Sequence, residues 1–157
     1  MNFDELKALL EDMDLSKILP QSDAMVASVQ KVLQLAIMIG PLVLLGFGLL
    51  YLFAPPKEAN YALGYRFWWG MASLEAWTFT QKVAGIGWSS LGLILTVVMS
   101  IIGSSFKKKA LIDAVLIAGK CLLWELGLIL IACLVIDVIV VACFDRDGFR
   151  RSYFEKE

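Results

Sequence analysis

Residues 60–85, NYALGYRFWWGMASLEAWTFTQKVAG, separate two runs of sequence that are apolar enough to cross a bilayer. This stretch holds three of the five tryptophans and the first arginine of the chain, Arg66. A simple connector needs only turn residues and solubility, whereas this one carries aromatic rings, a fixed cation and glycines. We therefore expect residues 60–85 to pack into a defined shape between two membrane helices.

Three apolar blocks surround this stretch, at residues 32–54, 83–103 and 110–144. Hydrophobic residues make up 59% of the 157 residues and charged residues 18%, against roughly 45–50% and about 25% in soluble domains. The first block would form roughly 35 Å of helix, enough for a hydrocarbon core of about 30 Å. The third block is too short for two spans and contains no proline, so it predicts one long helix.

A short amphipathic helix is predicted ahead of these blocks, at residues 2–19. Apolar side chains recur at spacings of three and four from Phe3 to Met13, and Pro20 ends the pattern. Because the helix is acidic, it suits a protein surface better than anionic lipid; a frayed, solvated leader is the alternative.

The fold class predicted is an all-α integral membrane protein of three transmembrane helices preceded by this amphipathic helix. The chain then divides into an acidic leader (1–31), a membrane domain (32–144) with a signature loop (55–82), and a charged, frayed tail (145–157).

The composition argues against several classes of function. A net charge of −1 gives no reason to expect a nucleic-acid partner. Histidine is absent, which removes Ser–His and Cys–His nucleophile pairs and most metal sites. Cys121, Cys133 and Cys143 share one apolar block without a CxxC spacing, so we expect them to be small buried hydrophobes. We expect no enzyme activity, no catalytic residues, no bound metal and no cofactor.

Small residues recur along one side of the second block. Gly85, Ser89, Gly92, Thr96 and Ser100 follow one another at spacings of three and four, which places them in one stripe of a helix. In lipid, such residues let two helix backbones approach closely and gain dispersion contacts. The stripe predicts a packing seam against another span.

The third block contains Lys120, Glu125 and Asp137. A charge at the bilayer centre costs on the order of 3 kcal/mol on insertion scales, so these side chains should face the bundle interior and find partners. Lys120 and Glu125 lie about 140° apart around a helix, so each should pair with another element. We expect Glu125 to pair with Arg66 or Lys82 and so to clamp the loop onto the bundle. The alternatives are that Lys120 snorkels to the interface and that Glu125 lies at the membrane surface.

The chemistry of several residues in the loop indicates a structural role for each of them. Gly64 permits a turn that a side chain would block, and Tyr65 suits the headgroup zone. Arg66 offers a planar fork to a carboxylate or a lipid phosphate. Ser73 is a candidate N-cap, with Glu75 in the first turn of the helix that follows. The alternative interpretation is an aromatic belt that happens to contain a helix start.

The order of these residues resembles the signature of the SdpI family of small bacterial membrane proteins. That signature has an asparagine, then Gly-Tyr-Arg-Thr, a serine, Trp-x-x-Ala-Asn and a glycine between two spans. The resemblance covers roughly residues 57–103. Three positions depart from the family's preference, namely Phe67 for Thr, Thr80 for Ala and Gln81 for Asn. The matching positions are Asn60, Gly64, Tyr65, Arg66, Ser73, Trp77 and Gly85.

The resemblance implies a multi-pass protein of the bacterial cell membrane. The family's namesake protects a cell from its own membrane-active peptide toxin and relays a signal by recruiting a repressor to the membrane. We therefore expect immunity to, or sensing of, a membrane-active peptide, with recognition at the loop or at the small-residue seam. The partners expected are membrane lipid, a peptide toxin or a cytoplasmic repressor; the oligomeric state and the orientation stay open. The alternatives are a small transporter or accessory subunit, marked by Lys120 and Glu125, and a structural membrane protein with no ligand.

Overall fold

A computed structural model describes residues 8, 23–59 and 63–151 of the chain. Within these residues the fold is helical, with an isolated antiparallel bridge between Phe144 and Arg150. Three helices are long and apolar enough to cross a membrane, which confirms the prediction of three spans. Of the predicted leader helix at residues 2–19, only Ala8 is described. The long helices are α3 (Asp23–Phe53), α4 (Leu74–Ser104) and α5 (Leu111–Cys143), and the short 3-10 helices are η1 (Trp69–Met71) and η2 (Ser105–Lys108).

The helices extend beyond the apolar blocks that predict them. α3 begins at Asp23, so residues 23–31, assigned from the sequence to the leader, are its first turns. Hydropathy predicts only the part of a helix that lies in the hydrocarbon core. The helix itself can extend beyond that part, as long as its backbone and polar side chains form hydrogen bonds. Gln30 supplies one such partner, because its Nε2 donates to the carbonyl oxygen of Lys109 at 3.0 Å. α5 is one unbroken helix, as predicted.

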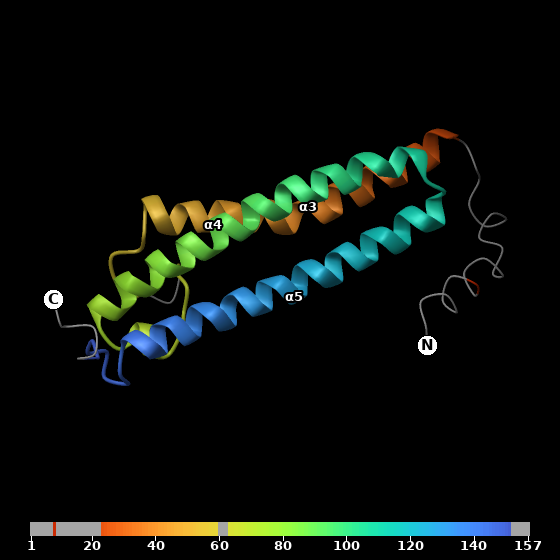
Figure 1. Cartoon of the computed structure of the whole chain (residues 1–157). Helices are drawn as coiled ribbons and strands as arrows, with labels where there is room; N and C mark the ends of the chain where they lie inside the picture. Colours follow the sequence, from red (N-terminus) through yellow and green to blue (C-terminus); the bar gives the residue numbers. More distant parts are fainter. Residues whose placement is uncertain (1–7, 9–22, 60–62, 152–157) are drawn as a thin grey trace.

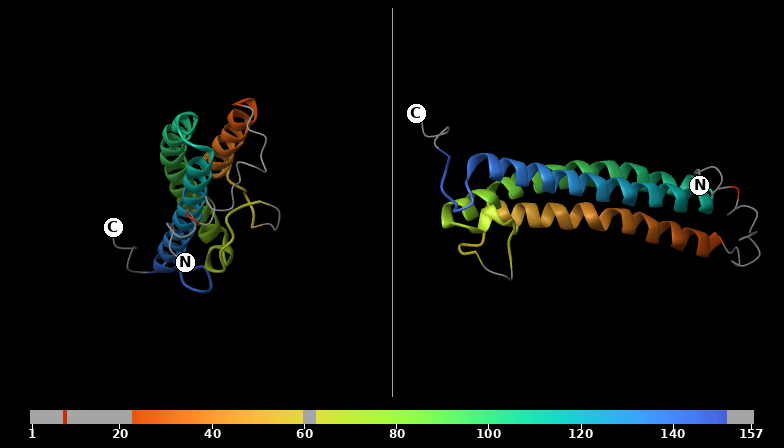
Figure 2. Two further views of the ribbon diagram at one scale, coloured as in Figure 1. Left: turned by 90° about the vertical axis from the view of Figure 1, so that its right-hand side faces the viewer. Right: turned by 90° about the horizontal axis from the view of Figure 1, so that it is seen from below.

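The three helices run side by side along a common direction (Figures 1 and 2). At one end lie the start of α3, the turn from α4 through η2, and the start of α5 (Figure 1). At the other end, the connection from α3 to α4 and the segment that follows α5 lie together (Figure 1). We call this second end, formed by residues 54–73 and 144–151, the capped end.

α3 and α4 make the closest contact in the bundle, and glycines make it possible. An ideal Cβ on Gly92 would lie 2.5 Å from the backbone nitrogen of Leu45, and one on Gly85 would lie 2.9 Å from Cγ of Leu52. On α3, a Cβ on Gly48 would overlap the backbone of Ser89. The small-residue stripe therefore packs against α3, as its spacing predicts, and dispersion between closely apposed backbones holds the pair together.

The outer surfaces of the helices are apolar. α5 exposes Leu123, Trp124, Leu130 and Val138 among other large side chains, and its membrane-spanning window is only 11% buried. In water such a surface would associate or aggregate, whereas lipid tails solvate it. The described part of the chain therefore has the organisation of a multi-pass membrane protein.

The first part of the charged tail is folded, which corrects the prediction that it is frayed. Phe144 is buried and packs on Phe79 of α4, with ring centroids 5.3 Å apart. The Asp145 carboxylate accepts the backbone N–H of Phe149 at 2.8 Å, and the N–H of Arg151 donates to the carbonyl of Cys143 at 2.9 Å. These bonds turn the chain back along α5; residues 152–157 lie outside the described part. Charge alone did not predict this turn, because Asp145 and Arg151 form it through hydrogen bonds to backbone groups.

Candidate functional site

Gly64 and Trp77 set the shape of the loop between α3 and α4. Gly64 has φ +123°, a conformation that side chains disfavour, and an ideal Cβ there would lie 2.5 Å from the Trp77 ring. Trp77 is fully buried in the first turns of α4, and its Nε1 donates to the carbonyl of Pro56 at 2.8 Å. The loop thus touches the six-membered ring of the indole at Gly64 and is bonded to the indole N–H at Pro56.

Gln81 holds the next residue of the loop through two hydrogen bonds. The backbone N–H of Tyr65 donates to Oε1 of Gln81 at 2.8 Å, and Nε2 of Gln81 donates to the Tyr65 carbonyl at 2.9 Å. Gln81 is 0% exposed, so these bonds satisfy groups that water does not reach. The side-chain amide thus makes the pair of hydrogen bonds to the Tyr65 backbone that a neighbouring β-strand would make. The sequence marked Gln81 only as a departure from the family pattern, and its central place was missed.

The side chain of Tyr65 links the loop to α5. Its hydroxyl lies 2.7 Å from Oδ1 of Asp137, to which it donates, and 3.1 Å from the carbonyl oxygen of Cys133. Its ring packs edge-on against Trp88, with centroids 5.5 Å apart. Burial first, and then the hydrogen bond to Asp137, raise the pKa of the Tyr65 hydroxyl, so it stays protonated and remains a donor. Tyr65 therefore joins the loop of the capped end to both α4 and α5.

Ser73 joins the start of α4 to the chain after α5. Its Oγ accepts the N–H of Ala76 at 3.1 Å, which confirms the predicted N-cap. The same hydroxyl donates to the carbonyl of Gly148 at 2.7 Å. Gly148 has φ +81°, and a Cβ there would lie 2.7 Å from Cβ of Ser73, so the two backbones touch. One hydroxyl thus caps the helix and anchors the C-terminal segment.

Other signature residues lie apart from this cluster. Gly85 belongs to the α3–α4 seam, and Asn60 lies outside the described residues. Arg66 is exposed, and so is Trp68, a residue of the same loop outside the signature, which is 82% exposed. The loop therefore has buried signature residues that build the capped end and exposed side chains that make none of these contacts.

The predicted pairing of Glu125 with Arg66 or Lys82 is wrong. Glu125 is buried and faces Gly40 of α3, where an ideal Cβ would lie 2.8 Å from Oε2. Both basic side chains are exposed, Arg66 in the loop and Lys82 on α4. Glu125 precedes Asp137 by twelve residues, or about 18 Å of helix. The acid that meets the loop is consequently Asp137, while Lys120 lies on the exposed side of α5.

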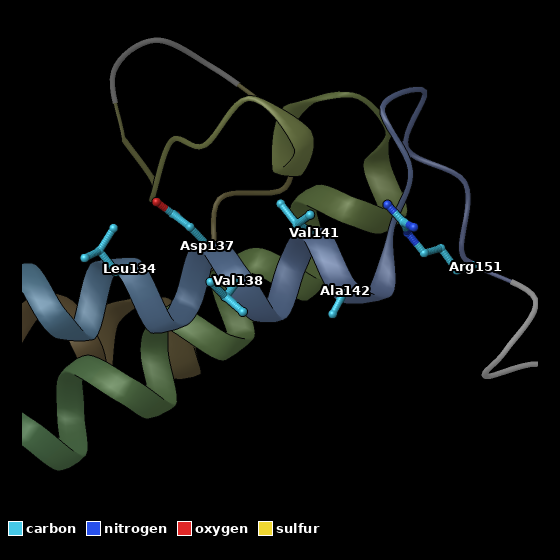
Figure 3. Close-up of a pocket in the computed structure, with 6 residues that line it drawn as sticks. All are labelled: Leu134, Asp137, Val138, Val141, Ala142 and Arg151. Carbon is cyan, nitrogen blue, oxygen red and sulfur yellow. The ribbon is translucent and has the colours of Figure 1, made fainter.

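A surface pocket adjoins the loop on the outer side of α5 (Figure 3). Asp137 stands at its edge with the carboxyl pointing toward the loop, and Arg151 comes from the segment that follows the helix (Figure 3). Arg151 is held there because its Nε donates to the carbonyl of Phe144 at 3.1 Å. The pocket can bury an apolar chain next to one anionic and one cationic group. Its lining residues are Leu134, Asp137, Val138, Val141, Ala142 and Arg151.

In the ranges that the structure describes, no group of three or more His, Cys, Asp and Glu lies close enough together to hold a metal ion. Cys121 is buried, Cys133 and Cys143 are half-buried, and all three are free thiols. The site is therefore described by its hydrogen bonds and surfaces.

The model of the SdpI/YfhL protein family matches residues 57–144, which is more than half of the chain. The chain belongs to this family. The family match includes α5 as well as the loop and α4, so it reaches further than the resemblance over residues 57–103. No curated protein and no solved structure matches the chain.

The extent of the match agrees with the contacts of the SdpI/YfhL capped end. Tyr65 bonds to Gln81 on α4 and to Asp137 on α5, so a loop of this kind needs both helices. The matched segment contains Tyr65, Gln81 and Asp137 and ends at Phe144, whereas Pro56 and Gly148, which bond to Trp77 and Ser73, lie just outside it. The family segment thus contains the contacts of Tyr65 that hold the loop against α4 and α5.

Proposed function

We propose that this protein acts without catalysis in a bacterial cell membrane, where it confers immunity to, or senses, a membrane-active peptide. Membership of the SdpI/YfhL family, whose namesake has such a role, carries the proposal. The peptide would meet a bundle whose outer surface is apolar and whose capped end offers aromatic and cationic side chains. Both features suit an amphipathic peptide at the membrane interface.

We place recognition at the exposed side chains of the loop. The small-residue seam is filled by α3, so a peptide cannot use it without separating α3 from α4. Tyr65 and Trp77 are committed to internal hydrogen bonds. Arg66 and Trp68 remain at the surface of the same loop, with a guanidinium that can bind a carboxylate and an indole that can pack on apolar side chains.

The pocket beside Asp137 extends this surface along α5. Its lining is largely apolar, and the Asp137 carboxylate that it shares with Tyr65 places it next to the loop. An amphipathic helix could lay its apolar side against Leu134 and Val138 while its polar groups face Arg151. The proposed recognition surface therefore consists of the exposed loop and this pocket.

A peptide-challenge assay tests the proposal. The chain is expressed in a sensitive bacterium and challenged with a panel of membrane-active peptides, and the lethal concentration is compared with that of cells lacking the chain. We expect protection against at least one peptide, and its loss when Arg66→Ala and Trp68→Ala are combined. The matched controls are Lys108→Ala, an exposed cation at the opposite end, and Trp124→Ala, an indole 70% exposed on α5.

Two outcomes would count against the proposal. Equal killing with and without the chain, across the panel and at verified expression, would remove immunity. Protection that survives the Arg66→Ala and Trp68→Ala pair but disappears in Trp124→Ala would move recognition from the loop to the middle of α5.

A small transporter is the second candidate, and one observation favours it: Glu125 carries a carboxyl group into the middle of α5, where it is buried. On that hypothesis Glu125→Gln abolishes ion flux into vesicles that contain the purified protein. Unchanged flux in Glu125→Gln and in Lys120→Met would exclude it.

A further inference from the structure

Glu125 is a buried acid without a partner. Its side chain is 4% exposed, and its Oε1 has no hydrogen-bond partner in the described part of the chain. It lies near the middle of α5, the most apolar of the three spans. Buried polar groups are normally paired, and an isolated carboxylate is far more costly to bury than a neutral carboxylic acid.

The other two helices supply no counter-charge at this depth. α3 has no ionisable residue from Val32 to Leu50, and α4 has none from Val83 to Ser104. On α5, the neighbouring titratable groups are Cys121, one turn away and buried, and Lys120, which lies on the exposed side. The rest of the buried cluster next to Cys121 is apolar, namely Ile37, Leu44, Leu95, Met99, Phe106, Ala114 and Ala118.

Glu125 faces α3 at Gly40 and Pro41, where a proline interrupts the hydrogen bonding of the helix backbone. Gly40 leaves the space that the carboxyl occupies, since a Cβ there would lie 2.8 Å from Oε2. The next residue, Pro41, is buried inside the helix and has no N–H, so the carbonyl of Ile37 lacks its usual intrahelical donor. This part of α3 offers backbone acceptors in excess over donors. A protonated carboxyl, which has an O–H to donate, suits it better than a carboxylate, which can only accept.

We propose that Glu125 is a proton-binding site of the membrane bundle, and that α5 closes on α3 at Gly40 and Pro41 only while the carboxyl holds its proton. The ligand is the proton itself, and the conjugate carboxylate is the released state. The inference does not depend on peptide recognition, because Glu125 lies about 18 Å along α5 from Asp137, the acid that meets the loop. Since the closed bundle holds the proton more tightly than the open chain, stability is greatest at acid pH and falls as pH rises.

Infrared spectroscopy of the full chain in lipid bilayers tests the protonation state. We expect the wild type at neutral pH to show the C=O stretch of one carboxylic acid per chain. The band should be absent in Glu125→Gln and retained in the matched variant Asp137→Asn, which alters a half-buried acid elsewhere on α5. Uniform carbon-13 labelling of glutamate in the wild type should shift the band, which makes the assignment independent of any variant. A wild-type spectrum without this band at neutral pH would overturn the proposal.

Two further measurements use the same samples. The unfolding midpoint of the wild type should fall as the pH is raised, whereas that of Glu125→Gln, which imitates the neutral acid, should fall less. If the unfolding midpoints of the two proteins fall equally with pH, ionisation of Glu125 does not oppose the packing of α5 on α3. That result would overturn the proposal that α5 closes on α3 only while the carboxyl is protonated. Raising sodium chloride at constant pH should leave the band in place; loss of the band with sodium would mean that the site binds a metal cation instead of a proton.

Discussion

Gly64 is the residue whose conformation the capped end constrains most. It combines a positive φ with a backbone that touches the Trp77 ring, while Gln81 and Asp137 hold the adjacent Tyr65 at its backbone and its hydroxyl. A tyrosine held at both ends cannot move to accommodate a change at Gly64. The Gly-Tyr pair of the signature is therefore explained by packing and hydrogen bonding inside this chain, before any ligand is considered.

Replacement of Gly64 by alanine should destabilise the protein. A strained backbone costs about 1–3 kcal/mol and overpacking about 1–3 kcal/mol, so we expect the free energy of unfolding to fall by about 2–6 kcal/mol. The measurement is an unfolding titration in detergent micelles. The control is Gly119→Ala on α5, where nothing lies within 4 Å of the added Cβ. Equal stability of the two variants would show that the contact with Trp77 does not constrain the loop.

The α3–α4 pair is the element on which the rest of the bundle is built. Its glycines bring the two backbones together, so attraction arises from many atom pairs at short range instead of from a hydrophobic force, which lipid does not provide. α5 then packs along this pair and supplies Asp137 to the loop. Stability should consequently be sensitive to small volume changes in the seam and tolerant of changes on the lipid side.

Gly92→Ala tests this dependence. The new Cβ would lie 2.5 Å from the backbone nitrogen of Leu45, and backbone cannot move aside as a flexible side chain can. We expect a loss of about 1–3 kcal/mol in the free energy of unfolding. Gly46→Ala is the matched control, since Gly46 lies on α3 with nothing within 4 Å. If Gly92→Ala unfolds at the same denaturant concentration as Gly46→Ala, the seam is looser than described.

At the scale of the whole molecule, the capped end connects segments that are distant in sequence. Ser73 bonds to Gly148, and Tyr65 bonds to Asp137. Together these contacts tie the loop and the C-terminal segment to the ends of α4 and α5 (Figure 1). The opposite end is joined more simply, by η2 and by the bond from Gln30 to Lys109.

Variants of Ser73 should release the C-terminal segment. Ser73→Ala loses both the cap, worth about 1 kcal/mol, and the bond to Gly148, whereas Ser73→Asp can still accept from Ala76 but cannot donate to Gly148. We expect trypsin to cleave both variants faster at Arg150 and Arg151 than the wild type, and only Ser73→Ala to lose the stability of the cap. Ser104→Ala is the control, because its hydroxyl bonds only within its own helix. Unchanged cleavage in both variants would mean that the segment is held by other contacts.

Much of this architecture could be predicted from the sequence because it depends on local patterns. Apolar blocks of sufficient length predict the three helices, the spacing of small residues predicts the seam, and Ser73 predicts the start of α4. The order of Gly64, Tyr65 and Arg66 among the other signature residues predicts the family. Each of these follows from properties of neighbouring residues or of one helical face.

Only the tertiary structure decided which residues meet across the bundle. A rise of about 1.5 Å per residue fixes relative depth along one helix, but depth between helices depends on register, which packing sets. That register brings Asp137 to Tyr65 and leaves Glu125 facing Gly40, the reverse of the pairing expected from charge. It also gives Gln81 its bonds to Tyr65. The composition determined that lipid surrounds the chain and that three long helices form. The backbone geometry at Gly64 and the glycine seam between α3 and α4 determined which residues contact one another across the bundle.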